Sequence, residues 1–580
     1  MSGRRPSNAE IARALREMAM FLEMDEVPFK PAAYERAADA VESLGGRVAD
    51  LHARGGLKAL GGIGHVGKGI ARRIEALITT GRIPELEDLR HRTPVDLLEL
   101  TRLEGVGPKM ARALYQELGV RTLQDLETAC RGRHLRHARG FGEKTEQKLL
   151  RGLERLQRTG GRIPLGAALP LAARIERSLA ELPFVTRVAT AGSIRRRKET
   201  IGDLDFLAVS TDPARLRDFF TALPDVEDVH ASGESKVMVR LQQGLDADLR
   251  IVPDECFGAA LLYFTGSKDH NVALRKIAIE RDLKLNEYGV FSGETSLAAK
   301  TEEEVYGALG LPFIPPELRE HRGEIEAARA GELPELIAYG ALRGDLQVQT
   351  DWTDGASSIE EMARAAQAMG YEYIAITDHT RDLGMARGST EARILEQVAA
   401  IDQINTRLTG FRILSGAEVN IRRDGSLDIA DETLARLDVV GAAIHHFFNL
   451  TREEMTERML RVIENPHVDI VFHPTARSLG KRDEVDVDLD RVMAAAARTG
   501  TVLEIDALPD RLDLRDELVR KAIQAGVKLA VDSDAHQVSD FAYADTLGVA
   551  TARRGWATRA DVINTRSAGD MLALLKGGGA

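Results

Sequence analysis

The sequence predicts a multidomain protein of mixed α and α/β class, with helical domains first, an α/β domain next and an α/β barrel last. Three observations support this order. Glycine pairs recur at the starts of predicted helices in the first 160 residues. A β-prone run at residues 203–209 carries alternating aspartates. Beyond residue 336, apolar β-prone runs alternate with amphipathic helical segments and end in polar residues, as in α/β barrels.

Length and composition agree with several soluble domains. A chain of 580 residues can bury several separate cores. Its two cysteines, Cys130 and Cys256, cannot build a disulfide framework, and no Cys-x-x-Cys pair indicates a zinc site. Neither an export leader nor an apolar run of about 18 residues occurs. We therefore expect a soluble cytoplasmic protein without a membrane partner.

Charge is distributed unevenly along the chain. The net charge of −12, taken alone, argues against a nucleic-acid partner. Residues 1–160, however, hold 28 Lys and Arg residues against 22 Asp and Glu residues, a net +6, whereas the remainder holds 50 against 68, a net −18. The basic part is thus N-terminal, although a charged run alone is more often a solvated face.

Three glycine motifs lie in this basic segment. Residues 103–111 have the form of a helix-hairpin-helix, residues 139–144 repeat it 35 residues later, and residues 62–71 carry a more ragged version. Glycines allow a tight hairpin and the close approach of a phosphate to the next helix N-terminus. One such motif can be an ordinary turn, but three in series predict a sequence-independent grip on the DNA backbone. The expected DNA-binding residues are Gly67, Lys68, Gly69, Gly105, Gly107, Lys109, Gly140, Gly142 and Lys144.

The central α/β segment carries a cluster of acidic residues. Asp203 and Asp205 lie in a β-prone run, where the period of two points both carboxylates to the same face and makes a clamp for divalent metal. Asp248, in a second β-prone run, is the expected third carboxylate, and Asp246 is the weaker candidate. An Asp-x-Asp pair alone can also be an exposed strand edge or turn.

The residues just upstream of this pair suit phosphate. The turn at Gly192-Ser193 offers backbone N–H groups and a hydroxyl, and the basic residues 196–198 add charge. Two cations held by the carboxylates could activate a 3′-hydroxyl and stabilise a leaving pyrophosphate. Together the turn and the carboxylates predict a nucleotidyl-transfer site.

Residues 192–205 resemble the palm of family X DNA polymerases, the group that includes DNA polymerase beta. Residues 263–267 are similar to the family's segment beside the sugar of the incoming nucleotide, and 285–288 to the closing segment of its thumb. Asn271 and Arg275 fall where the family contacts the nascent pair and the template. The resemblance implies Mg²⁺ or Mn²⁺ on Asp203, Asp205 and Asp248, with gapped or nicked DNA and deoxynucleoside triphosphates as partners. It implies nucleotide binding by Gly192, Ser193, Arg196, Gly202, Tyr263, Phe264, Gly266, Asn271 and Arg275.

The resemblance also exposes a departure. Some family members form a Schiff base through a lysine on the helix after the first hairpin. This chain has Arg73 at that position, and a guanidinium does not deprotonate usefully. Lys68 is a substitute whose expected task is instead to bind a 5′ phosphate. We therefore do not infer lyase activity from the resemblance.

In the C-terminal half, successive β-prone runs end in metal-type residues. They precede residues 378–379, Glu418, residues 445–446, His473 and residues 532–536. A lone histidine at a strand end is usually structural, but histidines at four strand ends, joined by acids, predict a metal cluster.

This half resembles the PHP domain, a metal-dependent phosphoesterase with a distorted α/β barrel that bacterial family X polymerases often carry. The resemblance implies Mn²⁺ or Zn²⁺ on seven positions: Asp354, His379, Glu418, His445, His473, Asp534 and His536. The opening motif departs from the family, because Gln347 and Gln349 stand where it usually has histidines.

The departure affects one of the family's three metal positions. That position would keep only Glu418 and Asp534. The other two would persist, one on Glu418, His445 and His473 and the other on Asp354, His379 and His536. We predict a reduced site that trims 3′ ends as a 3′ to 5′ exonuclease, and the alternative is a barrel that only supports the polymerase as a scaffold.

Together these features predict a monomeric bacterial-type family X DNA polymerase that fills gaps in base excision or double-strand break repair and lies at the nucleoid through DNA binding. Two rivals are a DNA-binding scaffold without catalysis and a small-molecule nucleotidyltransferase. The predicted domains are an N-terminal helical domain (1–85), fingers with two hairpins (86–160), a palm (161–255), a thumb (256–318), a linker (319–336) and the PHP domain (337–580).

Overall fold

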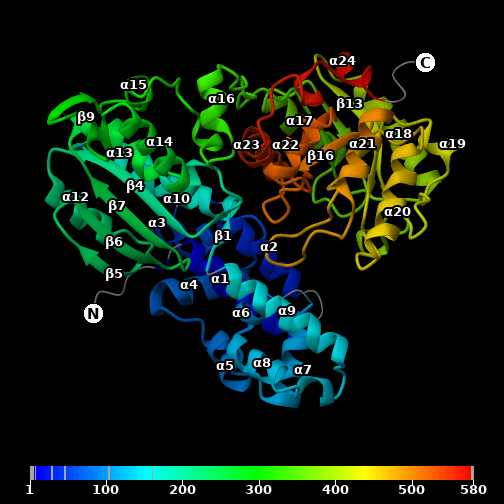
Figure 1. Cartoon of the computed structure of the whole chain (residues 1–580). Coiled ribbons are helices and arrows are strands. Elements are labelled where there is room, and N and C mark those ends of the chain that lie inside the picture. Colours follow the sequence, from blue (N-terminus) through cyan, green and yellow to red (C-terminus); the bar gives the residue numbers. More distant parts are fainter. Residues whose placement is uncertain are drawn as a thin grey trace. The chain divides into compact units, whose positions relative to one another are not determined.

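The computed structural model of the chain divides into two compact units, residues 1–160 and 161–580 (Figure 1). It describes residues 6–575 except 7, 28–29, 43, 45–46, 102, 104 and 160, so Glu104 of the middle hairpin motif lies outside the described residues. Within the described part, no helix is both long and apolar enough to cross a membrane.

The first unit is helical throughout its described residues. Its helices are α1 (Asn8–Met24), α2 (Lys30–Glu42), α3 (Val48–Leu60), α4 (Lys68–Thr80), α5 (Pro84–Arg92), α6 (Leu97–Leu100), α7 (Pro108–Leu118), α8 (Leu123–Arg131) and α9 (Glu143–Thr159), with a 3₁₀ turn η1 (Leu135–His137). Their apolar faces share one core, to which Val66 and Val106 of the hairpins contribute. Amphipathic helices of this length are held mainly by such packing.

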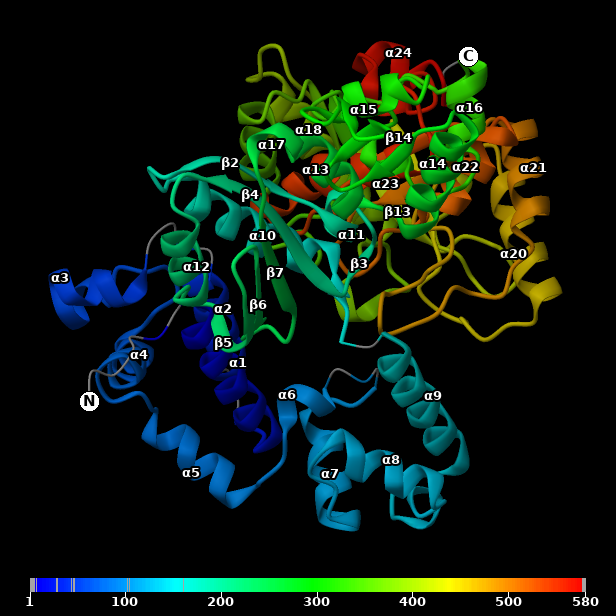
Figure 2. The ribbon, with the colours of Figure 1, turned by 60° about the vertical axis from the view of Figure 1, so that its left-hand side comes forward.

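The second unit begins with a five-stranded sheet in the order β2-β4-β7-β6-β5, whose strands are labelled in Figure 2. The strands are β2 (Val185–Thr190), β4 (Asp203–Ser210), β5 (Val226–Ser232), β6 (Lys236–Leu241) and β7 (Asp246–Ile251). A two-stranded sheet joins β1 (Ile163–Pro164) to β3 (Thr200–Ile201). Helices α10 (Leu165–Ala180) and α12 (Pro213–Thr221) bury apolar residues in the same core as the sheet.

A mixed helical and β segment follows the sheet. It comprises η2 (Asp254–Cys256), α13 (Phe257–Thr265), α14 (Lys268–Glu280), β8 (Lys284–Asn286), β9 (Gly289–Ser292), β10 (Thr295–Ala298), α15 (Glu302–Ala308) and η3 (Pro316–Leu318). Residues 319–336, predicted to be a linker, instead contain helix α16 (Glu324–Ala330). Arg319 and Glu324 are fully buried there. Their contacts with Glu302 and His270, at 2.6 Å each, hold this stretch on the preceding segment.

Residues 344–532 supply seven strands in consecutive order, all parallel. They are β11 (Gly344–Val348), β12 (Tyr373–Ile376), β13 (Arg412–Asn420), β14 (Val439–Ala443), β15 (Ile470–Val471), β16 (Val502–Asp506) and β17 (Leu529–Asp532). The backbone N–H of Gln349 donates to Ala535 O at 2.8 Å and so links the first strand to the segment after the last. The predicted α/β barrel is confirmed.

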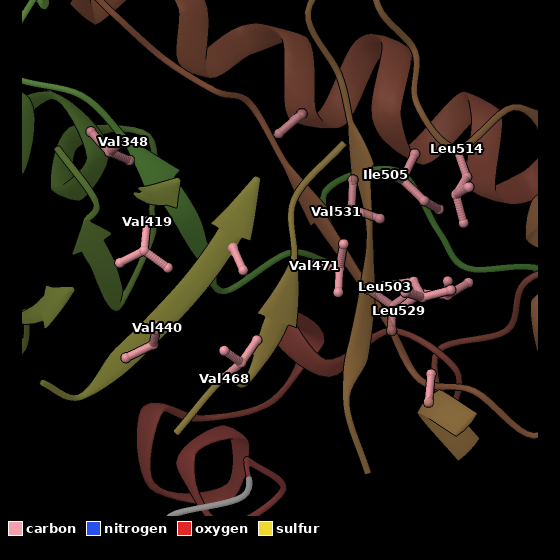
Figure 3. Packing of buried hydrophobic residues seen from close by; sticks show 14 of the residues in the cluster. Val348, Val419, Val440, Val468, Val471, Leu503, Ile505, Leu514, Leu529 and Val531 are labelled. Carbon is pink, nitrogen blue, oxygen red and sulfur yellow. The ribbon is translucent and has the colours of Figure 1, made fainter. Parts of the chain in front are cut away.

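Helices cover the outside of the barrel. They are α17 (Ile359–Ala368), α18 (Glu391–Asn405), α19 (Asp431–Leu434), α20 (Arg452–Glu464), α21 (Leu489–Thr499), α22 (Asp516–Gln524) and α23 (Val549–Arg554). Helix α24 (Ala568–Leu572) instead packs against inward-facing strand residues such as Leu346 and Val502. Alternation along each strand separates the helix-facing side from the interior. On β16, Leu503 and Ile505 join the large cluster shared with these helices (Figure 3). Glu504 and Asp506 therefore point inward, where both are fully buried.

Candidate functional site

The predicted carboxylates of the sheet come from two adjacent parallel strands. The register pairs Asp205 on β4 with Asp248 on β7, and Asp203 with Asp246. All four side chains share one face of the sheet, as the period of two requires. Asp246 pairs with Arg240 at 2.9 Å, whereas Asp248 lies directly beside Asp205 in the register and remains the predicted third carboxylate.

Like charges accumulate at this point of the sheet. Burial, followed by the charges of Asp203 and Asp248, raises the pKa of Asp205 to about 7. Lys236, which sequence analysis missed, places its Nζ 2.9 Å from Asp248 Oδ2. Carboxylates clustered on one strand pair suit divalent cations, which would replace the lysine as the positive charge beside Asp248.

The turn before β4 brings backbone close to these carboxylates. Gly192 begins the short helix α11 (Gly192–Arg195) with φ of +64°. A Cβ built on it would lie 2.1 Å from Asp205 Oδ2, so only glycine fits this approach. The neighbouring Ser193 has a buried hydroxyl with no hydrogen-bond partner among the described residues, which leaves it able to donate to a bound phosphate.

A basic cavity of about 550 Å³ opens beside this turn. Ser193, Arg196, Lys198 and Asp203 line it from the sheet side, and Arg554 of α23 lines it from the barrel side. Arg196 Nε pairs with Glu320 at 3.0 Å, and its Nη1 donates to the carbonyl of Thr265. Burial lowers the pKa of Lys198. The cavity is thus a concave, cationic space next to the carboxylates, which suits a polyphosphate.

Helices α13 and α14 bring together most of the remaining predicted nucleotide-binding residues. Tyr263 and Phe264 form an edge-to-face pair with ring centroids 5.1 Å apart. Asn271 Nδ2 donates to the carbonyl of Tyr263 at 2.7 Å. Gly266 ends α13 with φ of +71°, and the guanidinium of Arg196 would lie 3.2 Å from its Cβ.

The other two predicted nucleotide-binding residues stand apart from these contacts. Arg275 is a half-buried residue further along α14. Gly202 immediately precedes β4, and a Cβ there would lie 2.8 Å from Arg162 Nη1. Because Gly202 has no side chain, the Arg162 side chain can pack against its backbone. Arg162 also lines the basic cavity.

The hairpins of the first unit form three similar helix starts. Gly67 and Gly107 are the N-cap residues of α4 and α7, and Gly142 directly precedes α9. The left-handed position two residues earlier is taken by Gly105 and Gly140 in two hairpins and by His65 in the first. All nine predicted DNA-binding residues are exposed. Exposed N–H groups at such helix starts, with lysines beside them, suit a phosphate backbone.

Arg73, at the position of the family's lysine, is engaged in the packing of this unit. Its Nη1 donates to Gly69 O at 3.0 Å, and its Nη2 pairs with Glu85 at 3.1 Å. The guanidinium also lies 5.9 Å from the ring centroid of Tyr34. These contacts give Arg73 a structural role that needs no substrate.

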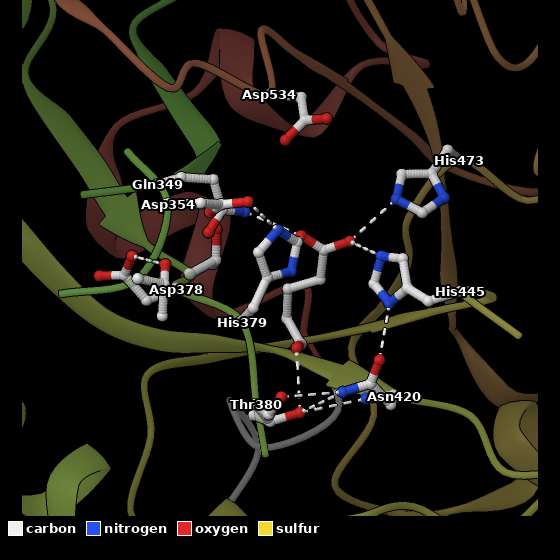
Figure 4. Close-up of polar contacts among 12 residues, drawn as sticks. Gln349, Asp354, Asp378, His379, Thr380, Asn420, His445, His473 and Asp534 are labelled. Atoms are coloured by element: carbon white, nitrogen blue, oxygen red, sulfur yellow. Dashed lines mark hydrogen bonds and ion pairs between the residues drawn. The ribbon is translucent and has the colours of Figure 1, made fainter. Parts of the chain in front are cut away.

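The strand ends of the barrel bring metal-type side chains together. Two groups, each with all ligand atoms within 4.8 Å of one another, occur among the described residues. They are Asp354, His379 and His536, and His379, Glu418 and His445. Figure 4 shows His379, His445 and His473 converging on one carboxylate, that of Glu418. In the structure, the ligand atoms of Glu418 and His445 therefore lie together with that of His379. His473 Nε2 also contacts Glu418 Oε1, at 2.8 Å.

Electrostatics prepare these side chains for a metal. Although burial opposes ionisation of Glu418, the charges of His379 and His445 hold its pKa well below the usual range. Burial lowers the pKa of His445, and it lowers that of His473 to about 3. Neutral imidazoles are the form that binds metals. Asn420, which the sequence reasoning missed, accepts from His445 Nδ1 at 2.8 Å and orients the ring so that Nε2 faces the site.

Further acidic and basic residues of the barrel interior were also missed. Glu504 and Asp506 end β16, and Arg511 follows in the next loop. The inward alternation of the run 502–506 was the available signal for the two acids. No local pattern marks Arg511, because its partners lie on other strands.

Four regions of the chain match family models. The chain matches the models of a helix-hairpin-helix domain (residues 6–83), a SAM-like helix-hairpin-helix tandem (97–155), a DNA polymerase beta thumb (260–320) and a PHP domain (345–495).

Three curated proteins are similar over different lengths. The DNA polymerase/3′-5′ exonuclease PolX of Bacillus subtilis is 39% identical over 98% of this chain and 99% of that protein. The DNA polymerase lambda of Arabidopsis thaliana is 26% identical over 49% of this chain and 57% of that protein. A probable phosphatase of Acetivibrio thermocellus is 32% identical over 31% of this chain and 73% of that protein.

Proposed function

The chain belongs to the family X DNA polymerases that carry a C-terminal PHP domain, and from that premise we propose that it extends DNA primers across gaps and trims 3′ ends with its barrel. The observation that carries the polymerase assignment is the β4–β7 register, which sets Asp205 against Asp248 beside Asp203. The proposal includes deoxynucleoside triphosphates as substrates and action as a monomer.

The sheet site divides into two parts with different tasks. Asp203, Asp205 and Asp248 would hold Mg²⁺ or Mn²⁺, which activates a 3′-hydroxyl and stabilises a leaving pyrophosphate. Gly192 and Ser193 offer an N–H group and a hydroxyl to the triphosphate. The cationic cavity beside them attracts the phosphates and orients them for in-line displacement.

The α13–α14 segment would shape the nucleoside end of the pocket. Asn271 Nδ2 fixes the carbonyl of Tyr263 at 2.7 Å, and the edge-to-face ring pair with Phe264 stiffens the same turn. A rigid aromatic wall beside the sugar leaves little room for a 2′-hydroxyl. This is the basis for proposing selectivity for deoxynucleotides.

In the barrel, two ligand groups share His379. Imidazole and carboxylate donors suit Mn²⁺ or Zn²⁺, which would polarise a phosphodiester and lower the pKa of water. Asn420 orients the His445 ring, and burial lowers the pKa of that imidazole, which favours its neutral form. We favour a 3′ to 5′ exonuclease over a scaffold, because buried imidazoles converging on one carboxylate have no evident structural use.

The hairpins would hold gapped or nicked DNA through its backbone. Their exposed glycine N–H groups and lysine ammonium groups suit phosphate oxygens, which carry no sequence information, so binding would be independent of sequence. Gap filling during DNA repair is the setting that such a grip and such a site support.

One paired assay tests both activities. A 5′-labelled primer on a gapped duplex is incubated with Mg²⁺ or Mn²⁺, with and without deoxynucleotides. Asp205→Asn should abolish extension and preserve shortening, whereas His379→Ala with His445→Ala should do the reverse. The matched controls are Asp228→Asn, an exposed acid on β5, and His467→Ala, outside the barrel site. Wild-type protein that never extends the primer refutes the polymerase, and protein that extends but never shortens it makes the barrel a scaffold.

A further inference from the structure

One region of the barrel interior contains several acidic side chains but lacks the histidines that usually complete a metal site there. It lies between Glu418 and Asp534, the two acids retained at the metal position that lost both histidines. Glu504 and Asp506 on β16 also face this region and are fully buried. Burial and mutual repulsion raise the pKa of Glu504 and of Asp506 well above the usual range. Acids buried this close together are stable as carboxylates only beside a positive charge.

That charge is provided by the chain itself. Arg511 Nε lies 3.3 Å from Asp506 Oδ2 and 3.8 Å from Asp534 Oδ2. Although burial opposes the charge, these two acids and Glu418 raise the pKa of Arg511 further above its ordinary value. The guanidinium, moreover, is among the charges that lower the pKa of His473. It therefore acts on the same acids that a metal ion at this position would contact.

The two glutamines present hydrogen-bond donors rather than lone pairs to the acids. Gln349 Nε2 donates to Glu418 Oε2 at 2.8 Å. Gln347, oriented so that its amide nitrogen faces Glu504, donates at 2.6 and 3.2 Å to the two carboxylate oxygens. An amide nitrogen cannot coordinate a cation. With no imidazole from residues 347 and 349, and with the Arg511 guanidinium 3.3 Å from Asp506 and 3.8 Å from Asp534, this position disfavours a metal cation.

We propose that Arg511, assisted by the amides of Gln347 and Gln349, permanently replaces one metal ion of the barrel site. The barrel then holds cations only at its other two positions, and Arg511 repels a cation from the third. This inference rests on the proposed metal-binding barrel. Arg511 is a positioning residue, because it sets the charge and orientation of Glu418 and Asp534 rather than contacting substrate.

A purely structural role for Arg511 is the alternative. Asp506 Oδ1 accepts from the backbone N–H of Leu508 at 2.7 Å, and Arg511 lies in the same loop. In that case Arg511 would brace the loop and have no effect on how many ions bind. The number of bound ions separates the two roles.

The test counts Mn²⁺ by equilibrium dialysis of the full chain. Asp203→Asn with Asp205→Asn first removes the sheet site. We expect about two ions per chain in this background, one for each ligand group. Gln347→His with Gln349→His should leave the count at about two, and adding Arg511→Met should raise it to about three. Arg491→Met, an exposed arginine paired with Glu453, is the matched control and should not raise it.

The outcomes separate this inference from the proposed function. A third ion bound by the histidine pair alone, with Arg511 intact, overturns the replacement but leaves the metal-binding barrel standing. No bound ion in the starting background overturns both. If the combined variant is poorly folded by circular dichroism, Arg511→Gln replaces Arg511→Met in the histidine-pair background. The melting temperature of that variant should rise more on adding Mn²⁺ than that of the histidine pair with Arg511 intact, and an equal rise overturns the inference.

Discussion

Replacing Gly192 by alanine perturbs the carboxylate cluster through a single methyl group. At a φ of +64°, an alanine costs about 1–2 kcal/mol of folding free energy. The new Cβ would also lie 2.1 Å from Asp205 Oδ2, 3.1 Å from its Cγ and 3.3 Å from its Cβ. The carboxylate must therefore retreat by about 1 Å, a displacement that costs about 100-fold in rate at a reacting centre.

Gly244→Ala separates the two effects. Gly244 has a φ of +76°, and nothing lies within 4 Å of its built Cβ, so this variant carries the strain without the collision. Both variants should lose about 1–2 kcal/mol of stability. Single-nucleotide extension of a gapped duplex should fall about 100-fold for Gly192→Ala only. Equal extension rates for the two variants would refute the idea that the Gly192 backbone positions Asp205.

Three other predictions concern the hairpins, the barrel and the buried ion pairs. Lys68→Ala, Lys109→Ala or Lys144→Ala should each reduce the slope of log affinity against log salt by about 0.9, measured by fluorescence anisotropy on gapped DNA, and an unchanged slope argues against a phosphate contact. Asn420→Ala removes the acceptor that orients His445 and should weaken Mn²⁺ binding by the barrel about 10–100-fold in equilibrium dialysis. An unchanged Mn²⁺ affinity would show that Asn420 does not orient this ligand. Glu302→Gln leaves the buried Arg319 and the half-buried Arg195 without their shared carboxylate and should cost about 3–5 kcal/mol in denaturant unfolding. Because these arginines lower the pKa of Glu302 although burial opposes it, its contribution is present above the ordinary value of 4.5 and is lost as pH falls through the folded-state pKa. The difference between wild type and variant should therefore shrink in acid, and a constant difference would contradict this assignment.

Much of the fold can be predicted from local pattern. Alternation around Asp203 and Asp205 predicts a strand with both carboxylates on one face, and the structure has β4 there. Repeated glycine pairs predict three helix starts, which are those of α4, α7 and α9. Apolar runs ending in histidine or acid predict parallel strands whose ends converge, as they do around Glu418.

Other features depend on residues far apart in the chain. Lys236 reaches Asp248 because β6 pairs with β7, and Arg511 meets Asp534 because a loop after β16 folds over the end of β17. Residues 319–336 read as a linker from their composition, yet Glu324 and Arg319 dock them through His270 and Glu302. None of these partners has a fixed spacing along the chain.

The physical reason lies in the range of the forces. Strand alternation and helix capping follow from the dihedral angles and hydrogen bonds of neighbouring residues, so a short stretch of sequence carries them in full. Strand register, a glycine beneath a carboxylate and a guanidinium among buried acids depend on how separate elements pack, and that is settled only when the whole core forms. The kinds of chemistry available to this protein could thus be inferred from its residues, but which charge compensates which acid required the folded chain.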